Sequence, residues 1–196
     1  GDGGSSKTDT YAAINSAGAY SLPFVLCIIN NQWAISVPRK SQTGAKTLAQ
    51  KGLAGGLDCV QVDGNDIIAV RAAMDHALKR ARNGHGGSVL ELVTYRLSDH
   101  TTADDARRYR DDAEVKAAWE REPMSRLRTF LISEGVWSEA EEAEWKEECG
   151  KLVDIEVNAY LETKVQPVEA MFDYLYAELP ADLEAQRADA IKWEGR

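Results

Sequence analysis

The chain opens with residues of types that can hold a phosphate group and a metal ion. Gly1–Ser6 reads Gly-Asp-Gly-Gly-Ser-Ser and is followed by a predicted helix. Glycines let backbone N–H groups approach a phosphate closely, and the N-terminus of a helix attracts anions. The carboxylate of Asp2 is the hard oxygen ligand that Mg²⁺ prefers, often while bridging to a phosphate. Because Gly-Asp-Gly also occurs in ordinary turns, this segment predicts a site only together with a second element.

The second element is a pair of asparagines at the end of a predicted strand. Asn30 and Asn31 directly follow the apolar run 24–29. If Asp2 also ends a parallel strand, one βαβ crossover brings Asp2 and Asn31 to the same edge of the sheet. The amide oxygen of Asn31 and a nearby backbone carbonyl would then complete the protein's share of an octahedral Mg²⁺ site. The alternative is that the asparagines only cap the end of the strand.

The first half of the chain alternates predicted helices and strands, which indicates βαβ crossovers and a parallel sheet. The expected elements are a helix from Thr8 or Asp9 to about Tyr20, a strand at 24–29, a strand at 59–62, a helix capped by Asn65 or Asp66, and a strand at 88–95. We therefore expect an α/β fold with a parallel sheet flanked by helices. The strand that should support the opening turn is absent, so we expect a fragment that lacks the N-terminal part of its domain.

The second half has a different pattern. Residues 97–110 are polar and predict a long loop, and the pattern is helical from about Asp112. Pro123 suits the first turn of a helix, and Ser138 begins a capping box that opens a long helix to about Leu161. A further helix is expected within 168–179. We therefore expect three parts: an α/β part at 1–95, a loop at 96–111 and a helical region at 112–196.

Composition narrows the class of protein. The chain is 44% hydrophobic and 28% charged, as is usual for globular proteins. Residues 1–93 hold nine basic against seven acidic side chains, and residues 94–196 hold 14 against 25. This acidity argues against a nucleic-acid partner, and no apolar run is long enough to span a membrane. We expect Cys27 and Cys59 to be buried free thiols in a reducing compartment.

The two opening elements together resemble a known fingerprint. Gly-Asp-Gly, about thirty residues and then Asn-Asn is similar to the thiamine-diphosphate fingerprint of transketolases and 2-oxo acid decarboxylases and dehydrogenases. Longer segments narrow the resemblance to the alpha subunit of heterotetrameric 2-oxo acid dehydrogenases. These segments are 30–38 (Asn-Asn-Gln-Trp-Ala-Ile-Ser-Val-Pro), 62–66 (Val-Asp-Gly-Asn-Asp) and 95–105 (Tyr-Arg-Leu-Ser-Asp-His-Thr-Thr-Ala-Asp-Asp) with Arg-Tyr-Arg at 108–110. The resemblance covers essentially the whole chain and implies a thiamine-diphosphate-binding fold.

The resemblance implies a specific set of site residues. The Mg²⁺ ligands of the family fall on Asp2, on Asn31 and on the backbone carbonyl of Trp33. The amides that bind the diphosphate fall on Gly3 and Gly4, and Asn31 also borders the cofactor. The family often has tyrosine at the position of Trp33, and a backbone ligand survives that change.

The loop at 96–111 carries the implied catalytic residue. By resemblance, His100 lies at the mouth of the active site, next to the cofactor, and stabilises charge while a lipoyl group is reductively acylated. The same resemblance implies that the loop orders when the cofactor binds and helps to dock the lipoyl domain. Thr101 occupies the position of a regulatory phosphoserine in mitochondrial relatives, and whether it is phosphorylated stays open.

The implied activity is the oxidative decarboxylation of a 2-oxo acid. Segments 4–38 and 45–56 resemble bacterial pyruvate dehydrogenase alpha subunits, which favours pyruvate, whereas 100–105 also resembles the branched-chain enzymes. The implied partners are a beta subunit, in a heterotetramer of two alpha and two beta chains, and a lipoyl acyltransferase. The chain alone should be inactive. The expected compartment is the bacterial cytoplasm, with the mitochondrial matrix as the alternative. Two other functional classes stay open, a non-catalytic α/β interaction protein and a generic Mg²⁺-dependent phosphate-binding enzyme.

Overall fold

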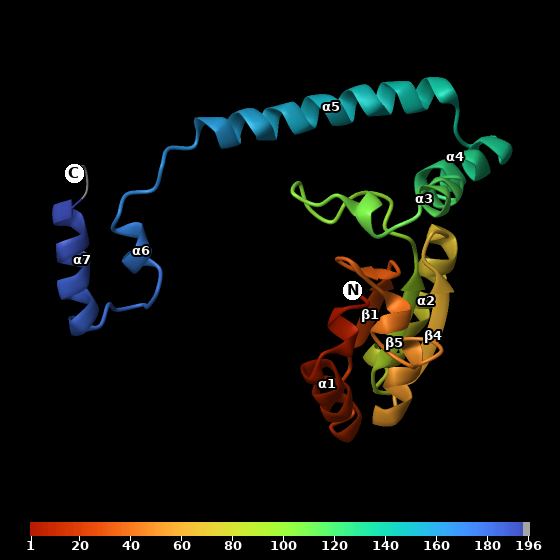
Figure 1. Ribbon diagram of the computed structural model, residues 1–196, viewed down its shortest axis with the longest axis horizontal. Helices are drawn as coiled ribbons and strands as arrows, with labels where there is room; N and C mark the ends of the chain where they lie inside the picture. The colour runs from red at the N-terminus through yellow and green to blue at the C-terminus, as the bar shows by residue number, and fades with distance from the viewer. Residues whose placement is uncertain (194–196) are drawn as a thin grey trace. The chain divides into compact units, whose positions relative to one another are not determined.

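The computed structural model describes residues 1–193, which form two compact units, Gly1–Ser138 and one that begins at Glu139. The first unit contains the main sheet (Figure 1) and the short 3-10 helices, which are labelled η. Its elements are η1 (Gly4–Ser6), α1 (Thr8–Ala19), β1 (Val25–Asn30), β2 (Trp33–Ala34), β3 (Val37–Pro38), η2 (Arg39–Ser41), η3 (Ala49–Gly55), β4 (Asp58–Asp63), α2 (Ile67–Arg82), β5 (Ser88–Val93), η4 (Ala106–Arg108), α3 (Asp112–Trp119) and α4 (Pro123–Ser133).

The main sheet consists of three parallel strands in the order β1-β5-β4. Asn30 and Asp63 both pair with Val93, so the three strands end at the same level. Helix α1 and the turn η3 contact each other, and α2 contacts β4 and β5. The main core cluster comprises Ile14, Ala17, Ile28, Leu48, Leu57 and Val89. The expected α/β fold, with helices flanking a parallel sheet, is confirmed.

Strand β1 lies at an edge of this sheet and is less buried than its apolar sequence predicts. Ile28 is buried, but Cys27 is exposed and Ile29 is 51% exposed. Cys27 pairs with Leu90 of the central strand, which is buried, so the same sheet face is covered at β5 and open at β1. The reason is that α2 packs mainly on β4 and β5. The prediction of a buried Cys27 is therefore wrong, and Cys59 is half-buried; all three cysteines are free thiols.

The helix starts show which sequence signals decide a boundary. Asp66 caps α2 as expected, because its Oδ1 accepts hydrogen bonds from the N–H groups of Ile68 and Ala69, both at 3.0 Å. Helix α1 instead has Lys7 at its N-cap with no side-chain cap, so the expected cap at Thr8 or Asp9 is wrong. The physical reason is that η1 leads directly into α1, and the main chain of this turn occupies the cap position.

The second unit is helical. It contains α5 (Glu139–Glu162), α6 (Ala170–Asp173) and α7 (Ala181–Trp193). The long helix expected from the capping box is confirmed as α5, whereas the helix expected within 168–179 shrinks to the four residues of α6. Pro180 starts α7, which the sequence pattern did not reveal, by accepting two backbone hydrogen bonds from the helix's first turn.

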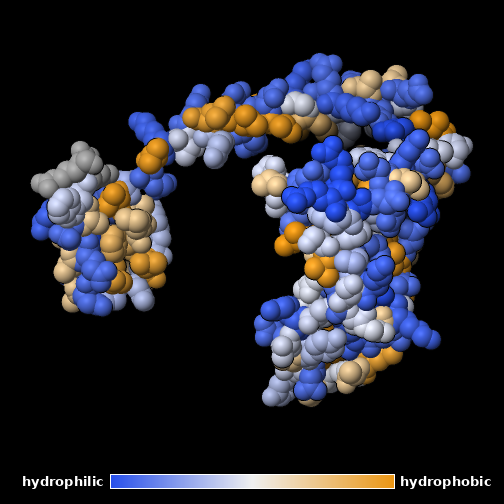
Figure 2. Space-filling view, in the orientation of Figure 1, coloured by the Kyte–Doolittle hydropathy of each residue, from blue (hydrophilic) through white to orange (hydrophobic). Residues whose placement is uncertain are grey.

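Helix α5 has no buried residue, and apolar side chains are visible along it in Figure 2. The large apolar side chains that it exposes are Trp145, Leu152, Val153, Ile155, Val157, Tyr160 and Leu161. Among the residues that the structure describes, no helix has the length and apolar character needed to cross a membrane.

Candidate active site

The opening turn packs closely against the end of β1 and the strand that follows it. A Cβ atom placed on Gly1 would lie 4.0 Å from the carbonyl oxygen of Ile29. A Cβ atom placed on Gly3 would lie only 2.6 Å from the Cβ of Ala34, so only glycine allows this approach of main chain to side chain. Asp2, between these glycines, is 2% exposed. The turn therefore lies at the carboxyl edge of the sheet, as the expected crossover requires.

The carboxylate of Asp2 is held by an amide. The Nε2 of Gln42 donates to Asp2 Oδ2 at 2.7 Å and also approaches the carbonyl oxygen of Val37 at 3.1 Å. The Oε1 of Gln42 is buried and has no hydrogen-bond partner in the described part of the chain. Asp2 forms no ion pair with any residue in 1–193. The carboxylate is thus nearly excluded from water, fixed in position, and without a neighbouring cation in contact.

The two asparagines have different surroundings. Asn30 is 3% exposed and points into the core, where its Nδ2 donates to Glu91 Oε1 at 2.7 Å. The Oδ1 of Asn31 accepts the N–H of Trp33 at 3.1 Å, the local turn that the capping alternative predicts. An amide oxygen has two lone pairs, so this hydrogen bond leaves Asn31 able to accept a second interaction. Of the pair, Asn31 is the residue that is available to a ligand.

Glu91 is a buried residue that sequence analysis does not single out. Its side chain accepts three hydrogen bonds, from Asn30 Nδ2 and from the backbone N–H groups of Leu48 at 2.7 Å and Ala49 at 3.0 Å. It therefore joins the end of β1, beside the candidate site, to the start of η3. One feature of the sequence could have indicated Glu91. It is the only charged residue in strand 88–93, Ser-Val-Leu-Glu-Leu-Val, whose other residues after Ser88 are apolar.

The loop that carries His100 is fastened by a charged network. Tyr109 Oη donates to Asp104 Oδ2 at 2.6 Å and accepts from Arg96 Nη2 at 2.5 Å. The same Asp104 oxygen accepts the backbone N–H of His100 at 2.8 Å. The hydrogen bond from Tyr109, together with that from the His100 amide, lowers the pKa of the Asp104 carboxyl below its usual value of 3.8. The ring of Tyr109 also lies 5.5 Å from that of Trp33, so the network connects the loop to the strand after Asn31.

This network predicts how the loop responds to one lost hydroxyl. In Tyr109→Phe, Asp104 and Arg96 lose the hydroxyl to which both are hydrogen-bonded. We expect trypsin to cut at Arg107 roughly tenfold faster or more, because local opening becomes easier. Tyr20→Phe, at a 75% exposed residue, is the matched control and should leave cleavage unchanged. Equal cleavage of all three proteins would refute the network's role.

The pH dependence of this network follows from the same shift. Because the folded-state pKa of Asp104 is lowered, its contribution is fully present above the unfolded value of 3.8. It is lost as the pH falls through the lowered folded pKa. Protection of the loop amides, measured by hydrogen exchange, should therefore not change between neutral pH and about pH 5 on account of Asp104.

His100 itself is exposed. The close approaches of Gly1 to Ile29 and of Gly3 to Ala34 place the opening turn beside segment 29–34, which contains Asn31 and Trp33. Within residues 1–193, His100 forms no hydrogen bond with Asp2 or Asn31. No three histidine, cysteine, aspartate or glutamate side chains cluster in the described residues. The expected Mg²⁺ ligands are one carboxylate, one side-chain amide and one backbone carbonyl. Such a ligand set does not require three of these side chains to cluster.

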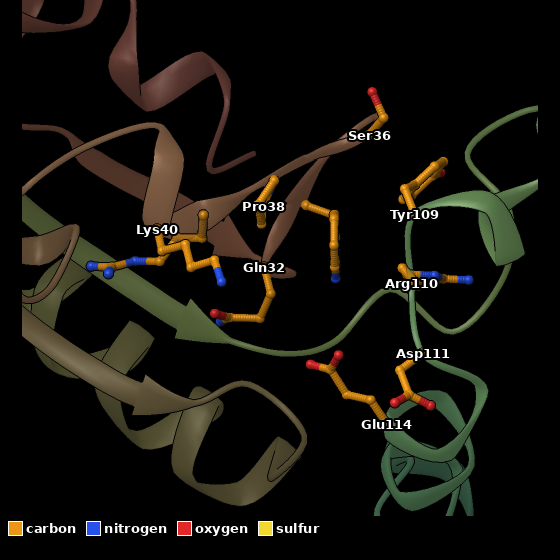
Figure 3. Close-up of a pocket in the computed structure, with 10 residues that line it drawn as sticks. Gln32, Ser36, Pro38, Lys40, Tyr109, Arg110, Asp111 and Glu114 are labelled. Atoms are coloured by element: carbon orange, nitrogen blue, oxygen red, sulfur yellow. The ribbon is translucent and has the colours of Figure 1, made fainter.

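An open pocket of about 590 Å³ lies between the β2–β3 hairpin and the end of the loop. Figure 3 shows Lys40 and Gln32 on the hairpin side and Asp111 and Glu114 on the α3 side. Of the residues expected from sequence to form the site, this pocket includes Trp33 alone. It is therefore a neighbour of the candidate site and not the site itself.

Comparison with known proteins gives a consistent result. The family model described as dehydrogenase E1 component matches residues 1–169. The chain is 43% identical over 188 residues to the pyruvate dehydrogenase E1 component subunit alpha of Staphylococcus epidermidis, covering 95% of this chain and 50% of that protein. It is 40% identical over 187 residues to the 3-methyl-2-oxobutanoate dehydrogenase subunit alpha of Mycobacterium tuberculosis, covering 95% of this chain and 51% of that protein.

The chain thus spans about half the length of the curated relatives it matches. The matched region includes the opening turn, the sheet and the loop with His100. The chain belongs to the dehydrogenase E1 component family.

Proposed function

We propose that this chain provides the diphosphate and Mg²⁺ end of the active site in the alpha subunit of a thiamine-diphosphate-dependent 2-oxo acid dehydrogenase. The observation that carries the proposal is the position of Asp2, a carboxylate that is 2% exposed and lies at the end of β1. A buried carboxylate without a contacting cation is costly, and a bound metal ion relieves that cost.

The residues present fit both implied groups. Asp2, the amide of Asn31 and the backbone carbonyl of Trp33 would supply three hard oxygens, the donor type that Mg²⁺ selects. Gly3 and Gly4 carry no side chains, and a Cβ atom placed on Gly4 would meet nothing within 4 Å, so the backbone N–H groups of these glycines would hold the diphosphate. The unpartnered Oε1 of Gln42 adds a buried acceptor beside this turn.

The mechanism divides the chemistry between cofactor and protein. When bound, thiamine diphosphate would supply the nucleophilic carbon that the decarboxylation of a 2-oxo acid needs. The protein's opening turn anchors the cofactor so that this carbon is fixed in place. His100 stabilises charge when the acyl group moves to the lipoyl group. The hydrogen bonds of Asp104 and Tyr109 would hold the loop that carries this exposed side chain.

We further propose pyruvate as the substrate, with branched-chain 2-oxo acids as the alternative, and a bacterial cytoplasmic enzyme. The partners would be a beta subunit, in a heterotetramer of two alpha and two beta chains, and a lipoyl acyltransferase. Relatives named for pyruvate and for 3-methyl-2-oxobutanoate are similar to this chain to nearly the same degree, 43% and 40%. The preference for pyruvate rests on the resemblance of segments 4–38 and 45–56 to the pyruvate enzymes.

The test of the substrate is a comparison of turnover by the complete heterotetramer. We expect kcat/KM for pyruvate to exceed that for 3-methyl-2-oxobutanoate by roughly tenfold or more, since the second substrate carries two more methyl groups and each added carbon changes transition-state binding in a pocket by about 1–3 kcal/mol. A higher kcat/KM for 3-methyl-2-oxobutanoate would show that pyruvate is not the preferred substrate, and it would leave the family assignment intact. The isolated 196-residue chain should show no turnover.

A non-catalytic α/β interaction protein is the rival of another class. It predicts no calorimetric signal when thiamine diphosphate and Mg²⁺ are added to the full-length protein with its beta partner. Binding of thiamine diphosphate and Mg²⁺ to that complex would exclude the non-catalytic interpretation.

A further inference from the structure

Lys51 is a buried cation directly beneath the opening turn. It lies in η3, is 5% exposed, and sits 46 residues away from the turn in the chain. Its Nζ donates to the backbone oxygen of Ser5 at 2.7 Å, to Ser5 Oγ at 3.0 Å and to Ser6 Oγ at 3.4 Å. The nitrogen also lies 5.5 Å from the centre of the Tyr11 ring. No other lysine of the described residues is buried to this degree.

The partners of Lys51 satisfy its hydrogen bonds but leave its charge unbalanced. All three acceptors are neutral serine oxygens, and no carboxylate forms an ion pair with Lys51 within residues 1–193. A buried ammonium without a counter-charge is costly, because the low-dielectric interior does not replace the solvation that water gives. A bound anion would supply the missing counter-charge, and the turn that Lys51 contacts is the segment expected to take the diphosphate.

A continuous chain of contacts runs from Lys51 to the expected metal ligand. Ser5 Oγ accepts from Lys51 Nζ and donates to the backbone oxygen of Asp2 at 2.6 Å. The lysine thereby fixes the main chain on both sides of Gly3 and Gly4. Because Ser5 is buried and this network is shielded from solvent, salt in the solvent should screen the lysine's field only weakly.

On this basis, and on the proposed function, we propose that Lys51 is a positioning residue for the cofactor's diphosphate. Its hydrogen bonds to Ser5 and Ser6 hold the turn Asp2–Ser6 in place. Its buried positive charge would be balanced by the bound diphosphate. Lys51 contacts the turn and not the ligand, so it acts through Ser5 and through its field. Its effect should grow with the negative charge of the ligand.

The experiment measures ligand affinity in the complete heterotetramer by calorimetry with Mg²⁺. Lys51→Met removes the charge and keeps the length of the side chain, whereas Lys51→Gln keeps a donor for Ser5. We expect the Kd of thiamine diphosphate to rise roughly tenfold or more in Lys51→Met, because the turn loses its charge-assisted hydrogen bonds to Lys51 and the diphosphate loses a nearby positive charge. Lys51→Gln should fall between Lys51→Met and the unmodified protein. Lys46→Met, at an exposed lysine of the same segment, is the control and should bind normally.

Comparison of two ligands separates the charge from a merely structural role. Thiamine monophosphate carries less negative charge than thiamine diphosphate, so its Kd should rise by a smaller factor in both Lys51 variants. The loss of affinity should also persist at raised salt. An equal loss for the two ligands, or an unchanged Kd for the diphosphate, would overturn the proposal. If Lys51→Met fails to assemble, Lys51→Gln decides by the same criteria. Absence of binding by the unmodified heterotetramer would instead refute the proposed function itself.

Discussion

Asp2→Asn is expected to raise the Kd of thiamine diphosphate with Mg²⁺ roughly a hundredfold or more, because the bound Mg²⁺ loses its carboxylate partner and breaking such a buried charge pair costs about 3–5 kcal/mol. The substitution changes little else. An asparagine at this position can still accept the hydrogen bond that Gln42 Nε2 donates at 2.7 Å, and its volume is nearly that of aspartate. The loss should therefore appear in ligand affinity and not in assembly of the heterotetramer.

The measurement is calorimetric titration of the complete heterotetramer at several Mg²⁺ concentrations. Asp9→Asn is the matched control, because Asp9 is exposed and lies in the first turn of α1, near the turn but outside the expected ligand set. Higher Mg²⁺ should restore part of the affinity of Asp2→Asn, since a neutral amide oxygen binds the ion more weakly than a carboxylate. An Asp2→Asn protein that binds as tightly as the Asp9→Asn control would disprove the role given to Asp2.

Glu91→Leu is expected to produce the largest loss of stability. The substitution leaves the amide of Asn30 and the N–H groups of Leu48 and Ala49 buried without their acceptor. Each unsatisfied buried donor costs about 1–3 kcal/mol, so the three donors together cost about 3–9 kcal/mol. Glu91→Gln should also destabilise, because its amide NH₂ group must face one of these donors.

The stability test is the thermal unfolding midpoint of the assembled heterotetramer without cofactor. Glu148→Leu, at an exposed position on α5, removes the same charge and should change the free energy of unfolding by about 0.5 kcal/mol or less. Because Asn30 precedes Asn31, Glu91→Leu should weaken cofactor binding as well. A midpoint for Glu91→Leu equal to that of Glu148→Leu would show that the buried network adds no stability.

These residues illustrate which parts of the site could be predicted from sequence. The placement of Asp2 at the edge where β1 ends followed from one rule, that parallel strands joined by a crossover end at the same side of a sheet. The cap at Asp66 was predictable because its partners lie two and three residues away. Local patterns and the crossover rule therefore predicted the three strands, α2 and the long helix α5, but not α7 or the cap of α1.

The supporting residues could not be predicted because their partners lie far along the chain. Glu91 binds groups 42, 43 and 61 residues away, and Lys51 binds serines 45 and 46 residues away. No periodicity in the sequence encodes such pairs. The exposure of Cys27 was mispredicted for a related reason, since burial at an edge strand depends on which helix covers it and not on how apolar the strand is.

The position of a bound metal ion shows directly whether Asp2, Asn31 and the backbone of Trp33 hold Mg²⁺. Crystals of the complete heterotetramer grown with thiamine diphosphate and Mn²⁺, a stand-in for Mg²⁺ with a strong anomalous signal, would locate it. We expect one anomalous peak at about 2.0–2.3 Å from a carboxylate oxygen of Asp2, the Oδ1 of Asn31 and the backbone oxygen of Trp33. The diphosphate should lie on the amides of Gly3 and Gly4. A metal and diphosphate bound elsewhere, with Asp2 still bonded only to Gln42, would contradict it.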